Sequence, residues 1–132
     1  MAYEETLRAF TLDADASIGI YTGPPGVQGS ATPNYGKQYH FVKVTGSHTA
    51  GLAGNGEAAV GVLQNKPQNV GNGATVAYQG ISMVFAGAII NPGQQVQANA
   101  SGQAIVKTAG VALGIAIEGA AAGELCPVLL QV

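Results

Sequence analysis

Apolar and polar residues alternate between Phe10 and Ile20. The apolar positions are Phe10, Leu12, Ala14, Ala16, Ile18 and Ile20, and polar or small residues lie between them. An apolar residue at every second position predicts a β-strand with one buried face. Two partners for that face are open: the strand can form an edge of this chain's own sheet, or it can pair with another subunit.

Short apolar segments follow one another from residue 38 onward, with turn residues between them. The predicted strands cover residues 39–45, 59–63, 75–84, 94–98, 104–107, 112–117 and 125–131. A change of parity at Gln79-Gly80 indicates a bulge or bend within the third of them. Strands that recur about every 8–12 residues, without a helical period, predict an all-β barrel or sandwich.

The segment from Thr22 to Pro33 interrupts this pattern. It holds three Pro and three Gly, and neither a helix nor a central strand tolerates that content. We therefore expect residues 1–36 to form an extended N-terminal arm with a Pro/Gly connector. Residues 37–132 are expected to form the body, a small antiparallel β-barrel or sandwich.

Composition limits the classes of partner. The 132 residues suffice for one domain. Charged residues make up 9% and the net charge is −2. Five Lys and Arg without a cluster argue against nucleic-acid binding, which needs a basic footprint. No apolar run is long enough to cross a bilayer as a helix, so no membrane partner is expected. A charge-poor surface favours close packing of subunits.

The residues that carry chemistry form no recognisable constellation. His40 and His48 match no zinc-ligand spacing, and Cys126 has no histidine partner nearby. The loop Gly51-Leu-Ala-Gly-Asn-Gly56 lacks the Gly-Lys-Ser/Thr ending of a phosphate-binding loop. We therefore expect no catalytic residues, no metal site, no cofactor and no enzymatic activity.

Four segments carry a resemblance to a known family. They are residues 61–65, 86–96, 99–103 and 113–130, with the sequences GVLQN, AGAIINPGQQV, NASGQ and LGIAIEGAAAGELCPVLL. Over residues 58–131 the chain resembles the capsid decoration, or cement, proteins of tailed bacteriophages. The resemblance implies a body of β-tulip or small-barrel type and a structural role in the virion.

The resemblance also implies a partner and a place. Decoration proteins bind the capsid exterior, contact the phage major capsid protein and stabilise its lattice, often as homotrimers with an N-terminal arm on the capsid. The expected capsid-contact residues are Phe10, Leu12, Ile18 and Ile20. Two other functions stay open: a β-barrel module that binds a glycan or a host surface, and a base domain of a tail or head fibre.

Overall fold

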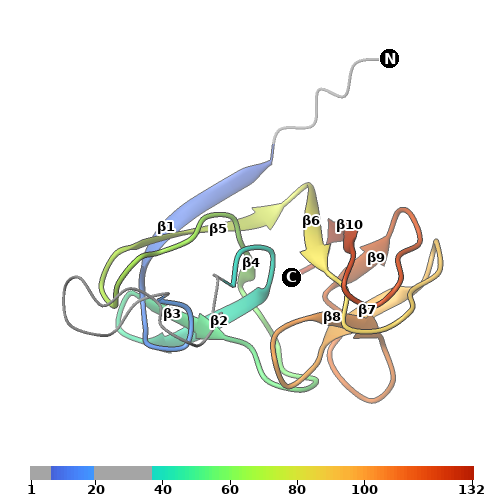
Figure 1. Cartoon of the computed structure of the whole chain (residues 1–132), viewed down its shortest axis with the longest axis horizontal. Coiled ribbons are helices and arrows are strands. Elements are labelled where there is room, and N and C mark those ends of the chain that lie inside the picture. The colour runs from blue at the N-terminus through green and yellow to red at the C-terminus, as the bar shows by residue number, and fades with distance from the viewer. Residues whose placement is uncertain (1–6, 20–36) are drawn as a thin grey trace.

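The computed structural model describes residues 7–19 and 37–132, whose regular structure is entirely β (Figure 1). Strands β1 to β5 form a closed barrel in the order β1-β3-β2-β4-β5, and β6 to β10 form a second sheet in the order β6-β10-β9-β7-β8. The predicted all-β fold with a small barrel is confirmed. The strand bounds are β1 Arg8–Ala14, β2 Phe41–Gly46, β3 Thr49–Leu52, β4 Gly61–Leu63, β5 Gly73–Gln79, β6 Ile81–Phe85, β7 Gln95–Ala98, β8 Ala104–Val106, β9 Gly114–Ala116 and β10 Leu125–Leu130.

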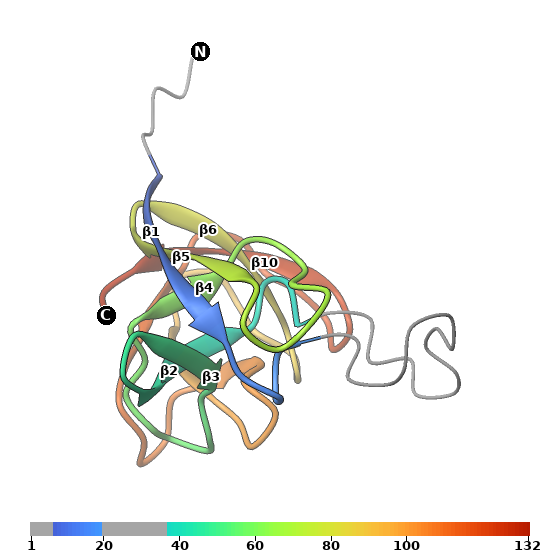
Figure 2. The ribbon, with the colours of Figure 1, turned by 90° about the vertical axis from the view of Figure 1, so that its left-hand side faces the viewer.

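Strand β1 closes the barrel from the N-terminal side. It pairs antiparallel with β5 and parallel with β3, and Figure 2 shows it crossing the barrel beside β5. The strand expected from Phe10 to Ile20 ends at Ala14, and a turn follows. Residues 8–14 are therefore a barrel strand and not an arm outside the body. The physical reason is that the buried face of β1 finds its apolar partners within the same chain. Residues 1–6 and 20–36 of the expected arm lie outside the described residues.

Gly80 is the point at which the chain passes from the barrel to the second sheet. Its φ of 108° is a left-handed conformation that glycine adopts without strain. The N–H of Leu130 donates to its carbonyl at 3.0 Å, which aligns β6 with β10. The bend predicted at Gln79-Gly80 is thus present, and it divides the predicted strand 75–84 into β5 and β6.

One hydrophobic core joins the two sheets. Phe41 and Val62 of the barrel are fully buried in the same cluster as Val84 and Val128 of the second sheet. A smaller cluster fills the other end of the barrel and includes Leu12. The shared core makes the barrel and the second sheet one packed body, because separating them would expose apolar side chains of both to water.

A buried amide supports the junction on the β7 side. Gln97 is 3% exposed, and its Oε1 accepts hydrogen bonds from the N–H groups of Thr108 and Gly110 at 2.8 and 2.9 Å. Nearby, the N–H of Gly56 in a barrel loop donates to Ala98 at 2.8 Å. These bonds hold the loop after β8 and the barrel loop against the same strand.

Two turns of the second sheet have the same construction. Ile90 and Ala120 exchange backbone hydrogen bonds, both at 2.9 Å. Three residues after each lies a glycine with positive φ, Gly93 at 85° and Gly123 at 88°. The residue after each glycine accepts, through its side-chain oxygen, a backbone N–H three positions earlier at 2.8 Å. The two turns therefore repeat one backbone arrangement, and the hydrogen bonds between Ile90 and Ala120 join them to each other.

Candidate interaction surface

The residues expected to contact a capsid occupy different environments. Leu12 and Ile18 are buried, with 7% and 1% exposure, in the smaller core cluster of the barrel. Phe10 is 37% exposed, and Ile20 lies outside the described residues. The structure therefore does not bring these four residues together as one external face. Leu12 and Ile18 pack inside the barrel because β1 uses its apolar side to close it.

Phe10 belongs instead to an exposed aromatic pair. Its ring centroid lies 5.6 Å from that of Tyr78, with the ring planes inclined at 52°. Tyr78 on β5 is 38% exposed. Tilted aromatic contacts at this separation are favourable beyond their buried area, so the pair presents an ordered apolar spot at the end of β1 and β5.

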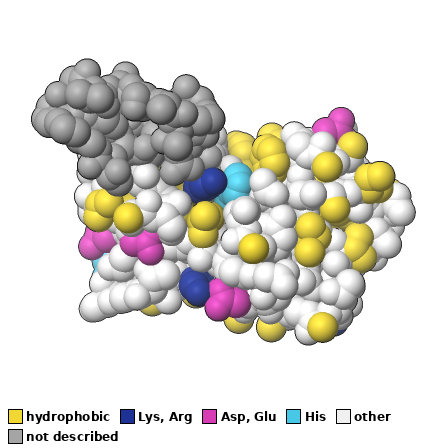
Figure 3. Space-filling view, turned by 60° about the horizontal axis from the view of Figure 1, so that its bottom comes forward, with side chains coloured by type: hydrophobic (Ala, Val, Ile, Leu, Met, Phe, Trp, Pro, Cys, Tyr) yellow, Lys and Arg dark blue, Asp and Glu magenta, His cyan; other side chains and the backbone are white. Residues whose placement is uncertain are grey.

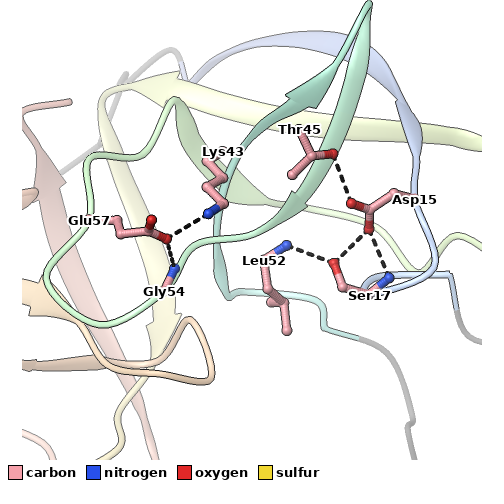
Figure 4. Close-up of polar contacts among 7 residues, drawn as sticks. All are labelled: Asp15, Ser17, Lys43, Thr45, Leu52, Gly54 and Glu57. Atoms are coloured by element: carbon pink, nitrogen blue, oxygen red, sulfur yellow. Dashed lines mark hydrogen bonds and ion pairs between the residues drawn. The ribbon is translucent and has the colours of Figure 1, made fainter.

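A network of hydrogen bonds at Asp15 fixes the end of β1 (Figure 4). The Asp15 carboxylate accepts from the Ser17 N–H at 2.8 Å, the Ser17 hydroxyl at 2.6 Å and the Thr45 hydroxyl at 2.8 Å. The Ser17 oxygen in turn accepts from the N–H of Leu52 at 2.9 Å. One carboxylate thus links the turn after β1 to β2 and, through Ser17, to β3. This link holds Ile18 in the barrel core.

The largest run of outward apolar side chains lies on the second sheet. In antiparallel pairs, directly opposed residues share a face, and the register places Leu125 opposite Phe85, Pro127 opposite Met83, and Leu129 opposite both Ile81 and Ile115. Ile117 continues the face, since its N–H donates to Pro127 at 2.8 Å. We call these residues the outer apolar face: Ile81, Met83, Phe85, Ile115, Ile117, Leu125, Pro127 and Leu129.

The side chains of the outer apolar face are accessible. Met83 and Leu129 are each 38% exposed, Leu125 is 41% exposed and Ile117 is 43% exposed. The alternate residues of the same strands, such as Val84 and Val128, are fully buried on the other side of the sheet. The strands β6, β10 and β9 therefore carry apolar side chains on both sides, with Ser82 as a buried polar residue on the inner side of β6.

Charge is scarce around this face. From residue 81 to the end of the sequence there are three charged residues, Lys107, Glu118 and Glu124, and none belongs to the outer apolar face. In Figure 3, yellow hydrophobic side chains are scattered over the half of the molecule that holds the second sheet, and most charged groups lie over the barrel half or near the boundary. The face ends on β7, where Gln95 lies opposite Ile115.

The outer apolar face was not predicted from the sequence, although the sequence carries a signal for it. Residues 125–130 are almost continuously apolar, and such a run indicates a strand covered on both sides. Pro127 weakens that signal, because proline suggests an edge strand. The structure places β10 between β6 and β9. Pro127 lies just beyond the ladder with β9, which starts at Val128, so that ladder does not use the N–H that proline lacks, while the Pro127 carbonyl still accepts the Ile117 N–H.

His40 and Cys126, two further side chains that could carry chemistry, are buried in the fold. His40 is 6% exposed; its ring stacks on Phe85 with centroids 5.3 Å apart, and its Nδ1 lies 3.1 Å from the carbonyl of Gln38. Burial lowers the pKa of His40, with a further lowering from Lys37. Burial also raises the pKa of the Cys126 thiol, whose Sγ lies 3.3 Å from the carbonyl of Glu118. Within residues 7–19 and 37–132, no three His, Cys, Asp or Glu side chains gather as a metal site requires.

Comparison with known proteins identifies a fold relative. No protein-family model matches the chain, and no curated protein sequence matches it either. Among solved structures the fold is similar to the head fiber gp8.5 N base of bacteriophage phi29, with a TM-score of 0.67 and 17% sequence identity. The match covers 96% of this chain and 95% of that chain. The described residues contain no helix long and apolar enough to span a membrane.

Proposed function

We propose that this chain is a non-enzymatic structural protein of a phage virion and that it binds the outer surface of the capsid as a base domain. The observation that carries the proposal is the similarity of fold to a head fiber base, which extends over nearly the whole of both chains. The resemblance of residues 58–131 to capsid decoration proteins supports the same location from the sequence. The partner is then the phage major capsid protein, and neither nucleic acid nor membrane is a ligand.

The Phe10–Tyr78 pair is the proposed contact with the head. Of the expected contact residues that the structure describes, Phe10 alone exposes more than a third of its surface. An ordered aromatic pair can enter a pocket of a partner with little loss of conformational entropy, which is why aromatic residues are frequent at binding hot spots. Deleting residues 1–22 would remove β1 and open the barrel, so the contact is tested by point substitutions.

The test is co-sedimentation of the purified chain with expanded heads that lack it. We expect saturable binding by the unaltered chain and at least about tenfold weaker binding after Phe10→Ser with Tyr78→Ser, since a hot-spot pair contributes about 2 kcal/mol or more. Val70→Ser serves as the control, because Val70 is 53% exposed in the loop before β5, whereas Tyr78 lies at the other end of that strand. Absence of saturable binding by the unaltered chain would refute the proposed function.

The number of bound copies separates two roles of a head-bound protein. A lattice-stabilising decoration protein occupies nearly every equivalent site, so it binds at about one copy per major capsid subunit. A fiber base need not fill every equivalent site, because its role does not depend on tying neighbouring capsid subunits together. We propose the fiber-base role because the fold relative is such a base, and we expect gel densitometry at saturation to give fewer copies than capsid subunits.

A further inference from the structure

We propose that Asn72 is a site of spontaneous covalent modification, at which the side-chain amide is converted to a carboxylate through a cyclic imide formed with Gly73. The sequence contains two Asn-Gly pairs, Asn55-Gly56 and Asn72-Gly73. Both pairs have the same intrinsic chemistry, but the structure leaves the attacking nitrogen without a hydrogen bond only in the second. The inference goes beyond the proposed function, because it concerns the isolated chain with no partner bound.

The reaction is an attack of the Gly73 backbone nitrogen on Cγ of Asn72. The nitrogen loses its proton to water, a C–N bond forms, and the side-chain nitrogen of Asn72 leaves as ammonia, which gives a five-membered succinimide. Water then opens either carbonyl of this ring, and the product is aspartate or isoaspartate. Water is the co-reactant, and nothing is oxidised or reduced. Glycine favours the attack because it has no Cβ to crowd its nitrogen.

The attacking nitrogen of Gly73 donates no hydrogen bond within residues 7–19 and 37–132. In antiparallel strands, hydrogen-bonded and non-hydrogen-bonded residue pairs alternate. The Ala14 N–H donates to the Asn72 carbonyl at 2.9 Å. The next pair along the ladder, Asp13 opposite Gly73, is therefore a pair without hydrogen bonds. The Gly73 N–H points away from β1, to the side on which β4 has already ended at Leu63.

The side chain of Asn72 is open to water. It is exposed, as are Gly71 and Gly73 on either side of it, and it makes no hydrogen bond within the described part of the chain. A Cβ added to Gly71 would meet nothing within 4 Å. Water can therefore reach the site, both to take the proton and to open the ring.

The pair Asn55-Gly56 has the same sequence but a nitrogen that is held. The Gly56 N–H donates to the carbonyl of Ala98 at 2.8 Å, so its proton is not free to leave. The backbone of Gly56 is also packed against Gly110, whose Cα would lie 3.0 Å from a Cβ added to Gly56. Crowding of this kind generally corresponds to a factor of about five or more. We therefore expect Asn55 to react at least about fivefold more slowly than Asn72 in the folded chain.

The modification changes the end of the ladder that closes the barrel. A carboxylate at Asn72 adds a negative charge beside Asp13, so the net charge becomes one unit more negative than −2. Isoaspartate also inserts a methylene into the backbone. At this point Ala14 makes two backbone bonds, from the Gly71 N–H at 2.8 Å and to the Asn72 carbonyl at 2.9 Å. A lengthened backbone cannot keep both bonds, so the chain that carries isoaspartate should unfold at lower urea concentration.

The test is peptide mapping by tandem mass spectrometry of the full chain after incubation at mildly alkaline pH, in buffer and in urea. Digestion under mildly acidic conditions prevents further reaction during handling. In buffer we expect Asn72 to convert at least about fivefold faster than Asn55. In urea the two rates should converge, because both pairs are then free. Equal rates in buffer, faster conversion of Asn55, or conversion of Asn72 in urea alone would each overturn the inference.

Two variants separate the chemistry from its consequence. Gly73→Ala adds a Cβ that meets only the Thr11 Cγ2 at 3.3 Å; it should slow conversion of Asn72 and leave that of Asn55 unchanged. Asn72→Asp supplies the charge without the added methylene, so its urea midpoint should lie between those of the unaltered chain and of the chain with isoaspartate. Circular dichroism melting establishes that each variant is folded. A folded Gly73→Ala chain that converts Asn72 as fast as the unaltered chain refutes attack by this nitrogen.

Discussion

The substitution Asp15→Ala tests whether one carboxylate fixes β1 in the barrel. The side chain accepts three hydrogen bonds, from the Ser17 N–H, the Ser17 hydroxyl and the Thr45 hydroxyl, at 2.6–2.8 Å. Bonds to a charged group contribute about 1.5–3 kcal/mol each in general. Water can replace part of each bond at this half-buried position, so we take about 1 kcal/mol per bond, the value for an average hydrogen bond. The expected loss of unfolding free energy is therefore about 3 kcal/mol, a large share of the roughly 5–15 kcal/mol that stabilises a typical domain.

The assay is equilibrium urea unfolding followed by circular dichroism, with the difference in unfolding free energy taken from the midpoint and slope. Asp13→Ala is the matched control. It removes the same charge two residues away, where the side chain is exposed and makes no hydrogen bond to a described residue. We expect this control to change the unfolding free energy by less than about 0.5 kcal/mol.

A second substitution reaches the same carboxylate from the other side. A Cβ at Gly51 would overlap the Asp15 side chain, so Gly51→Ala should displace the carboxylate and lower the unfolding free energy by a similar amount. The reasoning is refuted if Asp15→Ala lies within about 0.5 kcal/mol of the unaltered chain, or if Asp13→Ala is equally destabilising.

Three further predictions follow from buried polar groups. His40→Gln should remove part of the loss of stability at acid pH. Burial lowers the pKa of His40 below 6.5 in the folded chain, so the contribution of neutral His40 to the unfolding free energy is present above pH 6.5 and is lost as the pH falls through the folded pKa. Urea midpoints of the variant and the unaltered chain at pH 7.5 and pH 5 would measure the difference. Cys126 should react with iodoacetamide far more slowly in the native chain than in urea, because burial raises the pKa of its thiol. Equal rates in the two conditions would contradict the buried position of Cys126. Gln97→Leu should lower the unfolding free energy by about 1–2 kcal/mol, since the N–H groups of Thr108 and Gly110, in the partly exposed loop after β8, lose their acceptor. The urea midpoint of this variant, compared with that of an exposed Gln95→Leu control, measures the effect.

Much of the fold was predictable from local pattern, because alternation and turn residues act over a few neighbours. The predicted strands after residue 70 correspond to β5 through β10, with boundary differences of up to two residues, and the bend at Gly80 was expected. Strand β3 was not predicted. Its sequence, Thr49-Ala-Gly-Leu52, has little intrinsic β-propensity, and it is a strand because β1 and β2 pair with it from both sides.

The candidate surfaces were less predictable because they depend on which elements meet. The alternation from Phe10 onward correctly indicated a buried face, but it could not distinguish a partner subunit from β5 of the same chain. The outer apolar face combines β6 with the consecutive strands β9 and β10, and β6 is distant from these two in the sequence although it lies beside β10 in the sheet. For strands that are apolar at nearly every position, the sequence alone does not say which side enters the core.

The separation of β1 from its partner along the chain also sets the order in which the barrel can form during synthesis. β1 ends at Ala14, and β5, which closes the barrel against it, is complete at Gln79. At roughly 5–20 residues per second, about 3–13 s pass between the two events on the ribosome. Throughout this interval Leu12 and Ala14 have no barrel to enter, and pairing between such distant segments is itself slow. Barrel closure is therefore a late step, and the yield of folded chain depends on how well the nascent strand is shielded while it waits.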